Sequence, residues 1–334
     1  TVGYWQNLLG TKNVLSCPES RINHAYRAMT VHSLLGTATR NGRKTQTDGL
    51  PYPMTFILSY YDTLRLYDQF GVSEVMRNSL AEMTGRQQPD GLIVDTTVTH
   101  GRMILASHGQ VMSSLATHVF YTQDKAFAEE IYPALQKAVE CIENDHRANA
   151  NGLMRASEPF DAEMILGHYT SHNLWGLTGL RNAIRVARFL GKEADVTHWT
   201  ELHASFEKSV LAALDASAEK DGYVPTGLYE FKTGQTSRAG FAEYQTNQDW
   251  ENSFLAWPCE VLAPNDFRVA ATVDRLRKFK YREGIMTYRN GQHLHQYVTV
   301  NSTMQDVVAG RDKKALIDVY HILLHAGSCH DAFE

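Results

Sequence analysis

Residues 170–190 read TSHNLWGLTGLRNAIRVARFL. No Asp, Glu, Lys or Arg occurs in this stretch before Arg181. The apolar residues recur at the spacing that places them on one helix face, at Leu174, Leu177, Leu180, Ile184 and Ala187. A helix whose first half carries no charge is expected to be buried nearly all round. The stretch therefore predicts an interior helix.

Three carboxylates precede this helix. Glu158, Asp161 and Glu163 lie within GLMRASEPFDAEMILGHY, residues 152–169. Because the helix that follows is expected to be internal, carboxylates at its entrance are expected to face an internal pocket.

The same contrast between charged and uncharged helices runs along the whole chain. Eleven helical segments are predicted, at 21–37, 54–70, 72–86, 108–121, 125–146, 170–190, 195–216, 251–263, 267–281, 294–309 and 313–326. The odd-numbered segments are amphipathic with charged outer faces. The even-numbered segments begin without charge, as in MTFILSYY, GQVMSSLATHVFY, NSFLAWP and HQYVTVNSTMQ. This alternation predicts an all-α fold, an (α/α)6 toroid of helical hairpins with the even-numbered segments inside.

The connections between the segments differ in length. Links from even to odd segments are short, whereas links from odd to even segments are long, at 38–53, 87–107, 147–169, 217–250 and 282–293. Long connections in a compact domain are usually functional. In a double ring all five emerge around the amino-terminal ends of the inner helices, whose free N–H groups favour anionic partners. We expect the functional site there.

A complete toroid has twelve helices. With eleven predicted, the chain is expected to be truncated before the twelfth inner helix, which would follow Glu334. The alternative is that a segment near the amino terminus supplies the missing helix.

Composition limits the classes of protein that fit. The 334 residues contain no linker or low-complexity tract, which predicts one domain over 1–334. A net charge of −5 gives no reason to expect nucleic acid. No apolar run approaches ~18 residues, so no membrane-spanning helix is expected. The sequence leaves the oligomeric state open. Its first residues lack a signal-peptide pattern. We nevertheless slightly favour a periplasmic or secreted location over a cytoplasmic one.

Metal and cofactor chemistry find no support in the sequence. The four cysteines, Cys17, Cys141, Cys259 and Cys329, form no CxxC pair. The histidines in HLH and HYTSH do not have the HxxxH spacing of zinc enzymes, and nucleotide-binding motifs are absent. We therefore expect no metal and no cofactor.

The long connections are rich in aromatic rings and neutral or charged polar groups. Such a rim suits a carbohydrate, whose C–H faces stack on rings and whose hydroxyls need directional partners. The candidate binding residues are Arg43, Asp48, Tyr52, His168, His172, Asn173, Trp250, Glu251, Tyr288, His293 and His295.

Paired carboxylates supply a candidate chemistry. Glycosidic hydrolysis needs one carboxylic acid to protonate the leaving oxygen and one carboxylate to activate water or attack carbon. The connection into the sixth segment and the residues after the eleventh are expected to lie across the pocket from each other. That placement sets Asp161 or Glu163 opposite Glu334.

The hairpin order and these residues resemble the six-hairpin glycosidases, the (α/α)6 toroids that include glucoamylases, trehalases and α-L-rhamnosidases. In glucoamylase-like members the general acid precedes a His-aromatic-Thr-Ser-like stretch, which His168-Tyr169-Thr170-Ser171 resembles. The resemblance implies an inverting glycoside hydrolase with Glu334 as general base. The acid segment reads PFDAEM where the family has Trp-Glu, which leaves the choice between Asp161 and Glu163 open.

Other activities occur on the same toroid. Polysaccharide lyases use Tyr, His or Arg to remove a proton beside a uronate, and sugar epimerases use a pair of histidines. Tyr288, His293 and His295 fit those roles. A non-catalytic, carbohydrate-binding toroid is the third reading.

Overall fold

The computed structural model describes residues 2–10, 15–47, 60–93, 105–156, 167–229, 251–288 and 293–328. Its helices are α1 (Val2–Gly10), α2 (Ser20–Leu35), α3 (Tyr60–Gln69), α4 (Ser73–Thr84), α5 (Ala106–Thr122), α6 (Lys125–Ala148), α7 (Thr170–Phe189), α8 (Glu193–Ser217), the 3-10 helix η3 (Glu251–Ser253), α10 (Phe267–Lys280), α11 (Gln296–Val308) and α12 (Asp312–His325). Its strands are β1 (Thr37–Arg40), β2 (Arg43–Gln46), β3 (His168–Tyr169), β4 (Gly227–Leu228), β5 (Tyr281–Arg282), β6 (Ile285–Tyr288) and β7 (His293–Leu294).

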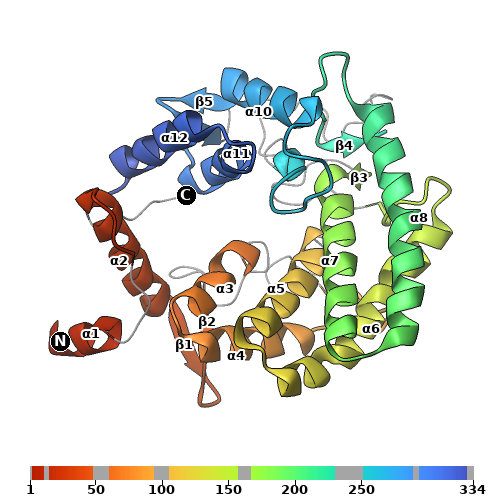
Figure 1. Ribbon diagram of the computed structural model, residues 1–334, viewed down its shortest axis with the longest axis horizontal. Helices are drawn as coiled ribbons and strands as arrows, with labels where there is room; N and C mark the ends of the chain where they lie inside the picture. The colour runs from red at the N-terminus through yellow and green to blue at the C-terminus, as the bar shows by residue number, and fades with distance from the viewer. Residues whose placement is uncertain are drawn as a thin grey trace.

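The helices form a double ring, seen in Figure 1. The inner elements α3, α5, α7, η3 and α11 follow one another in contact. The outer helices α4, α6, α8 and α12 pack against their inner neighbours as hairpins, and α8 lies outside α7 at the right of the figure. The predicted all-α toroid, with the even-numbered segments inside, is confirmed.

Burial follows the predicted pattern of charge. In α7 every side chain from Thr170 to Leu180 is buried, and in α5 every one from Ala106 to Ala116. Leu115 and Leu177, which the ring places inside, are 0% and 2% exposed. These uncharged stretches are buried because neighbours surround them on all sides, so no part of their surface needs a charge to remain in water.

The outer helices bury one stripe each. In α6 the stripe consists of Phe127, Ile131, Leu135, Ala138 and Ile142, and in α8 of Trp199, Leu202, Phe206, Val210 and Leu214. Their residues are three or four positions apart, which keeps them on the face toward the inner ring. The charged residues between them face water.

Two inner helices touch at glycines. A Cβ atom on Gly109 of α5 would lie 2.0 Å from the backbone oxygen of Trp175 in α7. A Cβ on Gly179 would lie 2.9 Å from the Cα of Gly109. Real Cβ atoms essentially never come this close to backbone, so only glycine permits the observed approach of α5 and α7.

One predicted helix is wrong. The stretch 251–263 contains only the 3-10 turn η3, followed by turns. Pro258 lacks the N–H that a continuing helix needs, and it disfavours helical backbone at Trp257. The N–H groups of Ala256 and Trp257 donate to Gln305 Oε1 of α11 instead of to the preceding turn.

The sequence did not predict α1, and α1 is not a twelfth inner helix. None of its residues is buried, and in Figure 1 it lies at the outer margin of the ring, beyond α2. The alternative in which an amino-terminal segment fills the inner ring is therefore not supported by the described residues.

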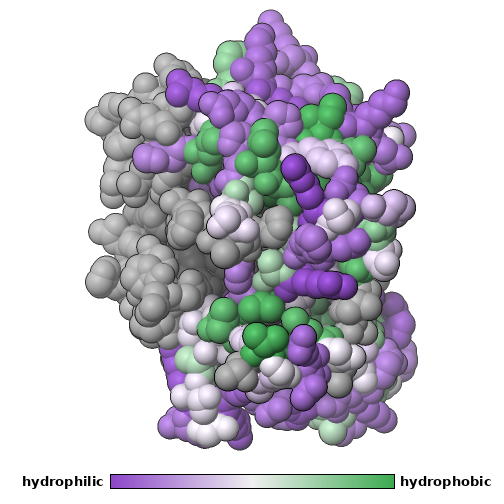
Figure 2. Space-filling model, turned by 90° about the vertical axis from the view of Figure 1, so that its left-hand side faces the viewer, coloured by the Kyte–Doolittle hydropathy of each residue, from purple (hydrophilic) through white to green (hydrophobic). Residues whose placement is uncertain are grey.

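The first and last outer helices meet on one side of the ring. Tyr320 of α12 donates a hydrogen bond to Glu19, the N-cap of α2 (3.3 Å). Exposed apolar residues of the two helices include Met29, Leu35, Leu316, Ile317 and Leu324. On this side Figure 2 shows hydrophobic residues in separate groups, with hydrophilic residues between them. The described residues therefore form no continuous apolar face here.

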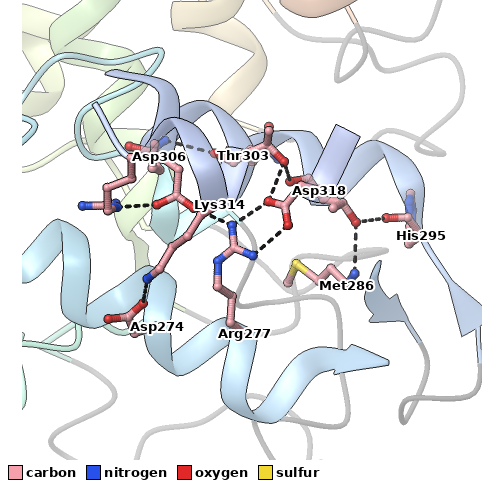
Figure 3. Close-up of polar contacts among 12 residues, drawn as sticks. Asp274, Arg277, Met286, His295, Thr303, Asp306, Lys314 and Asp318 are labelled. Atoms are coloured by element: carbon pink, nitrogen blue, oxygen red, sulfur yellow. Dashed lines mark hydrogen bonds and ion pairs between the residues drawn. The ribbon is translucent and has the colours of Figure 1, made fainter. Parts of the chain in front are cut away.

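Buried charges join α10, α11 and α12. Figure 3 shows Arg277 of α10 between Asp306 of α11 and Asp318 of α12. Its guanidinium donates to Asp306 Oδ2 (2.6 Å) and to both oxygens of Asp318 (2.8 and 2.5 Å). Both carboxylates are buried, and Arg311 also donates to Asp306. The two positive and two negative charges compensate one another, as burial requires.

None of the helices in the described part combines the length and apolar character needed to cross a membrane.

Candidate functional site

All the described strands lie in connections that lead into inner elements. β1 and β2 precede α3, β3 precedes α7, β4 precedes η3, and β5, β6 and β7 precede α11. The β3–β4 pair joins two of these connections, because His168 pairs with Leu228 and Tyr169 with Gly227. The β3–β4 pair therefore lies at the start of α7, whereas β2 packs against the outer helix α4.

Several residues in the first turns of the inner elements are polar and buried. They are Ser107, His108 and Gln110 in α5, Thr170, Ser171, His172 and Asn173 in α7, Glu251, Asn252 and Ser253 in η3, and His295 and Gln296 at the start of α11. Later turns of these helices bury polar residues too, such as His118 in α5 and Asn301 in α11. Polar groups cost free energy to bury, so those at the predicted end of the ring are candidates for ligand contacts.

An aromatic layer spans the inner ring close to this end. Its members are Tyr61 of α3, Trp175 of α7 and Phe254, which follows η3. The ring centroids of Tyr61 and Trp175 are 4.9 Å apart, and those of Trp175 and Phe254 are 5.9 Å apart, both edge to face. Trp175 is not among the binding residues predicted from the sequence. The layer joins three inner elements and belongs to the hydrophobic core, in which Trp175 and Phe254 are buried.

The two predicted binding residues in α7, His172 and Asn173, are both buried. The ring of His172 lies against that of Tyr169, with centroids 4.9 Å apart and planes tilted by 35°. Asn173 Oδ1 accepts the N–H of Met154 (2.9 Å), and its Nδ2 donates to the carbonyl of Tyr169 (2.8 Å). Asn173 therefore has a structural role, fixing the residues before the helix.

Glu251 opens η3 and is 5% exposed. The next residue, Asn252, donates to the carbonyl of Val224 (2.7 Å), which binds η3 to the chain segment that leads to β4. The segment continues into the β3–β4 pair beside His168. Glu251 and His168, separated by 83 positions in sequence, thus belong to one linked group of connections.

The hairpin before α11 carries three predicted residues. Tyr288 in β6 pairs with His293 in β7, whose side chain is exposed. His295 is buried at the N-cap of α11, and burial lowers its pKa to about 4. Near neutral pH the His295 ring is therefore uncharged, able both to donate and to accept a hydrogen bond.

Arg43 lies apart from these residues. It is an exposed residue of β2, and that strand packs against the outer helix α4, where Asn78 donates to the carbonyl of Lys44 (3.1 Å). The structure does not bring Arg43 to the inner ring. Several other predicted residues lie outside the described residues: Asp48, Tyr52, Asp161, Glu163, Trp250 and Glu334.

An ion cluster that the sequence did not reveal holds the chain just before the candidate acids. Arg155 Nε donates to both oxygens of Asp145 (2.9 Å each), and its Nη1 donates to Asp90 (2.8 Å). Asp145 lies near the end of α6, and Asp90 belongs to the connection into α5. Arg155 therefore ties two of the long connections together. No local pattern signals such pairs, which are 10 and 65 positions apart.

Removing this arginine is expected to destabilise the fold. Arg155→Met should cost at least about 2 kcal/mol of unfolding free energy, because it leaves the buried Asp145 carboxylate without its cation. Asp90→Asn, at the exposed end of the same cluster, should cost less than about 1 kcal/mol. Chemical denaturation of the two variants checks this. Equal losses would show that Asp145 does not depend on Arg155.

A second buried histidine fixes the connection into α5. His108 Nδ1 accepts the N–H of Ile93 (3.0 Å), so its proton is on Nε2, which donates to the carbonyl of Ala138 (3.0 Å). Burial lowers its pKa to about 4. A second proton would have to be placed on Nδ1, against the N–H of Ile93, so the ring remains neutral.

Stability is therefore expected to fall in mild acid. The pKa values of His108 and His295, about 4 in the folded chain, compare with an ordinary value near 6.5. The unfolded chain takes up protons first, and stability is lost as pH decreases from about 6.5 toward 4. Between pH 7 and pH 5 each histidine should remove about 2 kcal/mol. In denaturation at both pH values, His108→Gln should show a smaller difference than the parent; an unchanged difference would contradict the assignment.

The described residues contain no group of three or more His, Cys, Asp or Glu side chains placed to hold a metal ion. A shallow hollow at the turn Gly310–Lys314 lies at the far end of α11 and is lined by that turn alone.

Comparison with solved structures identifies the double ring. A GH78-family rhamnosidase of Bacillus sp. GL1 matches 91% of this chain over 30% of its own length, with TM-score 0.65 and 16% identity. A rhamnosidase from Klebsiella oxytoca with rhamnose bound matches 93% over 56% of its length, with TM-score 0.63 and 14% identity. A glycosidase in complex with glucose matches 93% over 85%, with TM-score 0.68 and 13% identity.

The first two matches show that this chain spans about a third and about half of those rhamnosidases. No protein-family model and no curated protein matches the sequence. At these identities the likeness shows the fold, which is the (α/α)6 toroid of helical hairpins.

Proposed function

We propose that this chain is a glycoside hydrolase. The observation that carries the proposal is the match of more than nine-tenths of the chain to the toroids of rhamnosidases and a glycosidase. The buried polar residues at the start of the inner elements support it, since the sequence predicts the functional site at that end of the ring. Fold alone does not define activity, so the chemistry is assigned to particular residues below.

Two carboxylates carry the reaction in this proposal. Asp161 or Glu163 is the general acid that protonates the glycosidic oxygen, and Glu334 is the general base that activates a water on the opposite face of the sugar. The acids follow Arg155, which Asp145 and Asp90 hold, and they precede β3, which β4 holds. Because the chain is held both before and after the acids, the acid can be kept in a fixed position relative to the substrate.

The expected substrate is a carbohydrate. His168, His172, Glu251 and His295 would supply hydrogen bonds to sugar hydroxyls. The structural neighbours include proteins with bound rhamnose and bound glucose, which makes rhamnosides and glucosides the first substrates to test. No cofactor is needed for this chemistry.

A screen with 4-nitrophenyl glycosides tests the proposal. The panel holds the α-L-rhamnoside, the α- and β-glucosides and the α-mannoside, with rhamnose- and glucose-containing oligosaccharides beside them. At least one compound should release nitrophenol or reducing sugar at a rate proportional to protein concentration. Failure to cleave any member would contradict the proposal.

A polysaccharide lyase is the second candidate, and one observation favours it. Tyr288 and His293, which fit the roles of proton-abstracting residues, stand opposite each other in the β6–β7 pair. A lyase would cleave only acidic polysaccharides and give an unsaturated product that absorbs ultraviolet light. Such a product from a uronate polymer, without hydrolysis of neutral glycosides, would establish the second candidate over the first.

A further inference from the structure

Hydrogen bonds to strand β6 and to Thr299 hold the backbone of His295 in place. Its N–H donates to the carbonyl of Met286 in β6 (2.8 Å), and its carbonyl accepts from the hydroxyl of Thr299 (2.9 Å). The same hydroxyl accepts the N–H of Met286 (3.0 Å). Figure 3 shows Met286 and His295 connected in this way. One hydroxyl therefore joins strand β6 to the first turn of α11.

The Thr299 hydroxyl has no substitute in this arrangement. Thr299 and Met286 are buried, so a Met286 N–H without the hydroxyl would lose its partner away from water. The backbone bond from the Thr299 N–H to the His295 carbonyl is long, at 3.3 Å. Much of the constraint on the His295 backbone thus comes from the side chain of Thr299.

The remainder of α11 is held by other contacts. The Thr303 hydroxyl, one turn along, is within hydrogen-bond distance of Asp318 Oδ2 (2.9 Å), and Asp306 is bound by Arg277. These contacts involve α10 and α12 and lie away from His295 (Figure 3). Loss of the Thr299 hydroxyl should therefore loosen the start of α11 and the β6–β7 hairpin while the body of the helix remains in place.

We propose that Thr299 is a positioning residue for sugar binding, which acts by fixing the His295 ring at the site. This inference rests on the proposed function. The sequence around Thr299 does not indicate this role, because the hydroxyl of Thr299 binds the backbone N–H of Met286, 13 positions earlier. An ordered partner loses less freedom on binding, so the effect should be on substrate affinity.

The test compares three variants of the full chain. Thr299→Val keeps the shape and removes the hydroxyl, Thr299→Ser keeps the hydroxyl, and Thr303→Val removes the matched hydroxyl one turn away. On the aryl glycoside that is hydrolysed fastest, Thr299→Val should raise KM about tenfold. Thr299→Ser and Thr303→Val should remain within about twofold of the parent.

A second comparison tests the route through His295. In a His295→Ala background, Thr299→Val should change KM by less than about twofold, because its effect is already absent. A full tenfold effect in that background would overturn the inference, as would equal KM values for Thr299→Val and Thr303→Val.

Direct titration separates this inference from the proposed function. Calorimetry with free rhamnose and free glucose measures binding in the same variants. A parent that binds either sugar but hydrolyses nothing would contradict the hydrolase proposal alone, and Thr299→Val should still weaken that binding about tenfold. A parent that binds neither sugar and hydrolyses nothing would overturn both.

Discussion

Replacing the true general acid by its amide is expected to slow hydrolysis of natural glycosides by about a hundredfold or more. The candidates are Asp161→Asn and Glu163→Gln. Natural glycosides have poor leaving groups and need a proton on the departing oxygen, whereas nitrophenyl glycosides need little protonation. The variant that lacks the acid should therefore keep much more of its activity on the nitrophenyl substrate. Turnover numbers on both substrates check this.

The general base is expected to behave differently. Glu334→Gln should impair both kinds of substrate equally, since water must be activated whatever the leaving group. Glu129→Gln, which alters an exposed carboxylate of the outer helix α6, is the control and should leave both rates unchanged. If Asp161→Asn and Glu163→Gln both retain full activity on a natural glycoside, the assignment of the acid is wrong. The next carboxylates to replace are then Glu158 and Glu251, of which Glu251 is buried at the start of η3.

The largest effect on folding is expected at Gly109. A Cβ atom there would lie 2.0 Å from the Trp175 oxygen and 2.3 Å from its carbonyl carbon. Backbone atoms in the middle of a buried helix cannot move aside as a flexible side chain can, so α5 and α7 would have to separate. Gly109→Ala should cost at least about 3 kcal/mol, at or beyond the upper end of ordinary overpacking.

Gly3→Ala is the matched control for that prediction. Gly3 also lies in a helix, but nothing stands within 4 Å of its added Cβ. Alanine there should be neutral or slightly stabilising, because it is the better helix former. Thermal unfolding of the two variants checks the pair. A Gly109→Ala chain that melts at the parent temperature would show that α5 and α7 are not in close contact.

The sequence predicts most of the ring because one physical signal repeats along it. Uncharged first halves distinguish the inner helices from one-sided outer helices, and α5, α7 and α11 follow that rule. The signal failed at 251–263, where an apolar stretch resembles a helix but contains Pro258 and gives two N–H groups to Gln305. Hydropathy alone does not reveal where backbone N–H groups donate to a distant side chain instead of to a helical carbonyl.

The sequence predicts only part of the candidate site. His172, Glu251 and His295 share the predicted end of the ring because the residues before inner helices must converge there. Asn173 has the right position but is used to hold the backbone of Met154 and Tyr169. The bonds that fix Arg155, Arg277 and Thr299 join residues 10 to 65 positions apart, and no local spacing encodes them.

The most direct test of the account is proton NMR of the first turnovers on the aryl glycoside that the chain hydrolyses fastest. Opposed carboxylates that leave room for a water, with carboxyl carbons roughly 6.5–9.5 Å apart, invert the anomeric centre. The account predicts that the first sugar released has the anomeric configuration opposite to that of the substrate, before mutarotation mixes the two forms. Release of the same anomer as the substrate, or of an unsaturated sugar, would contradict it.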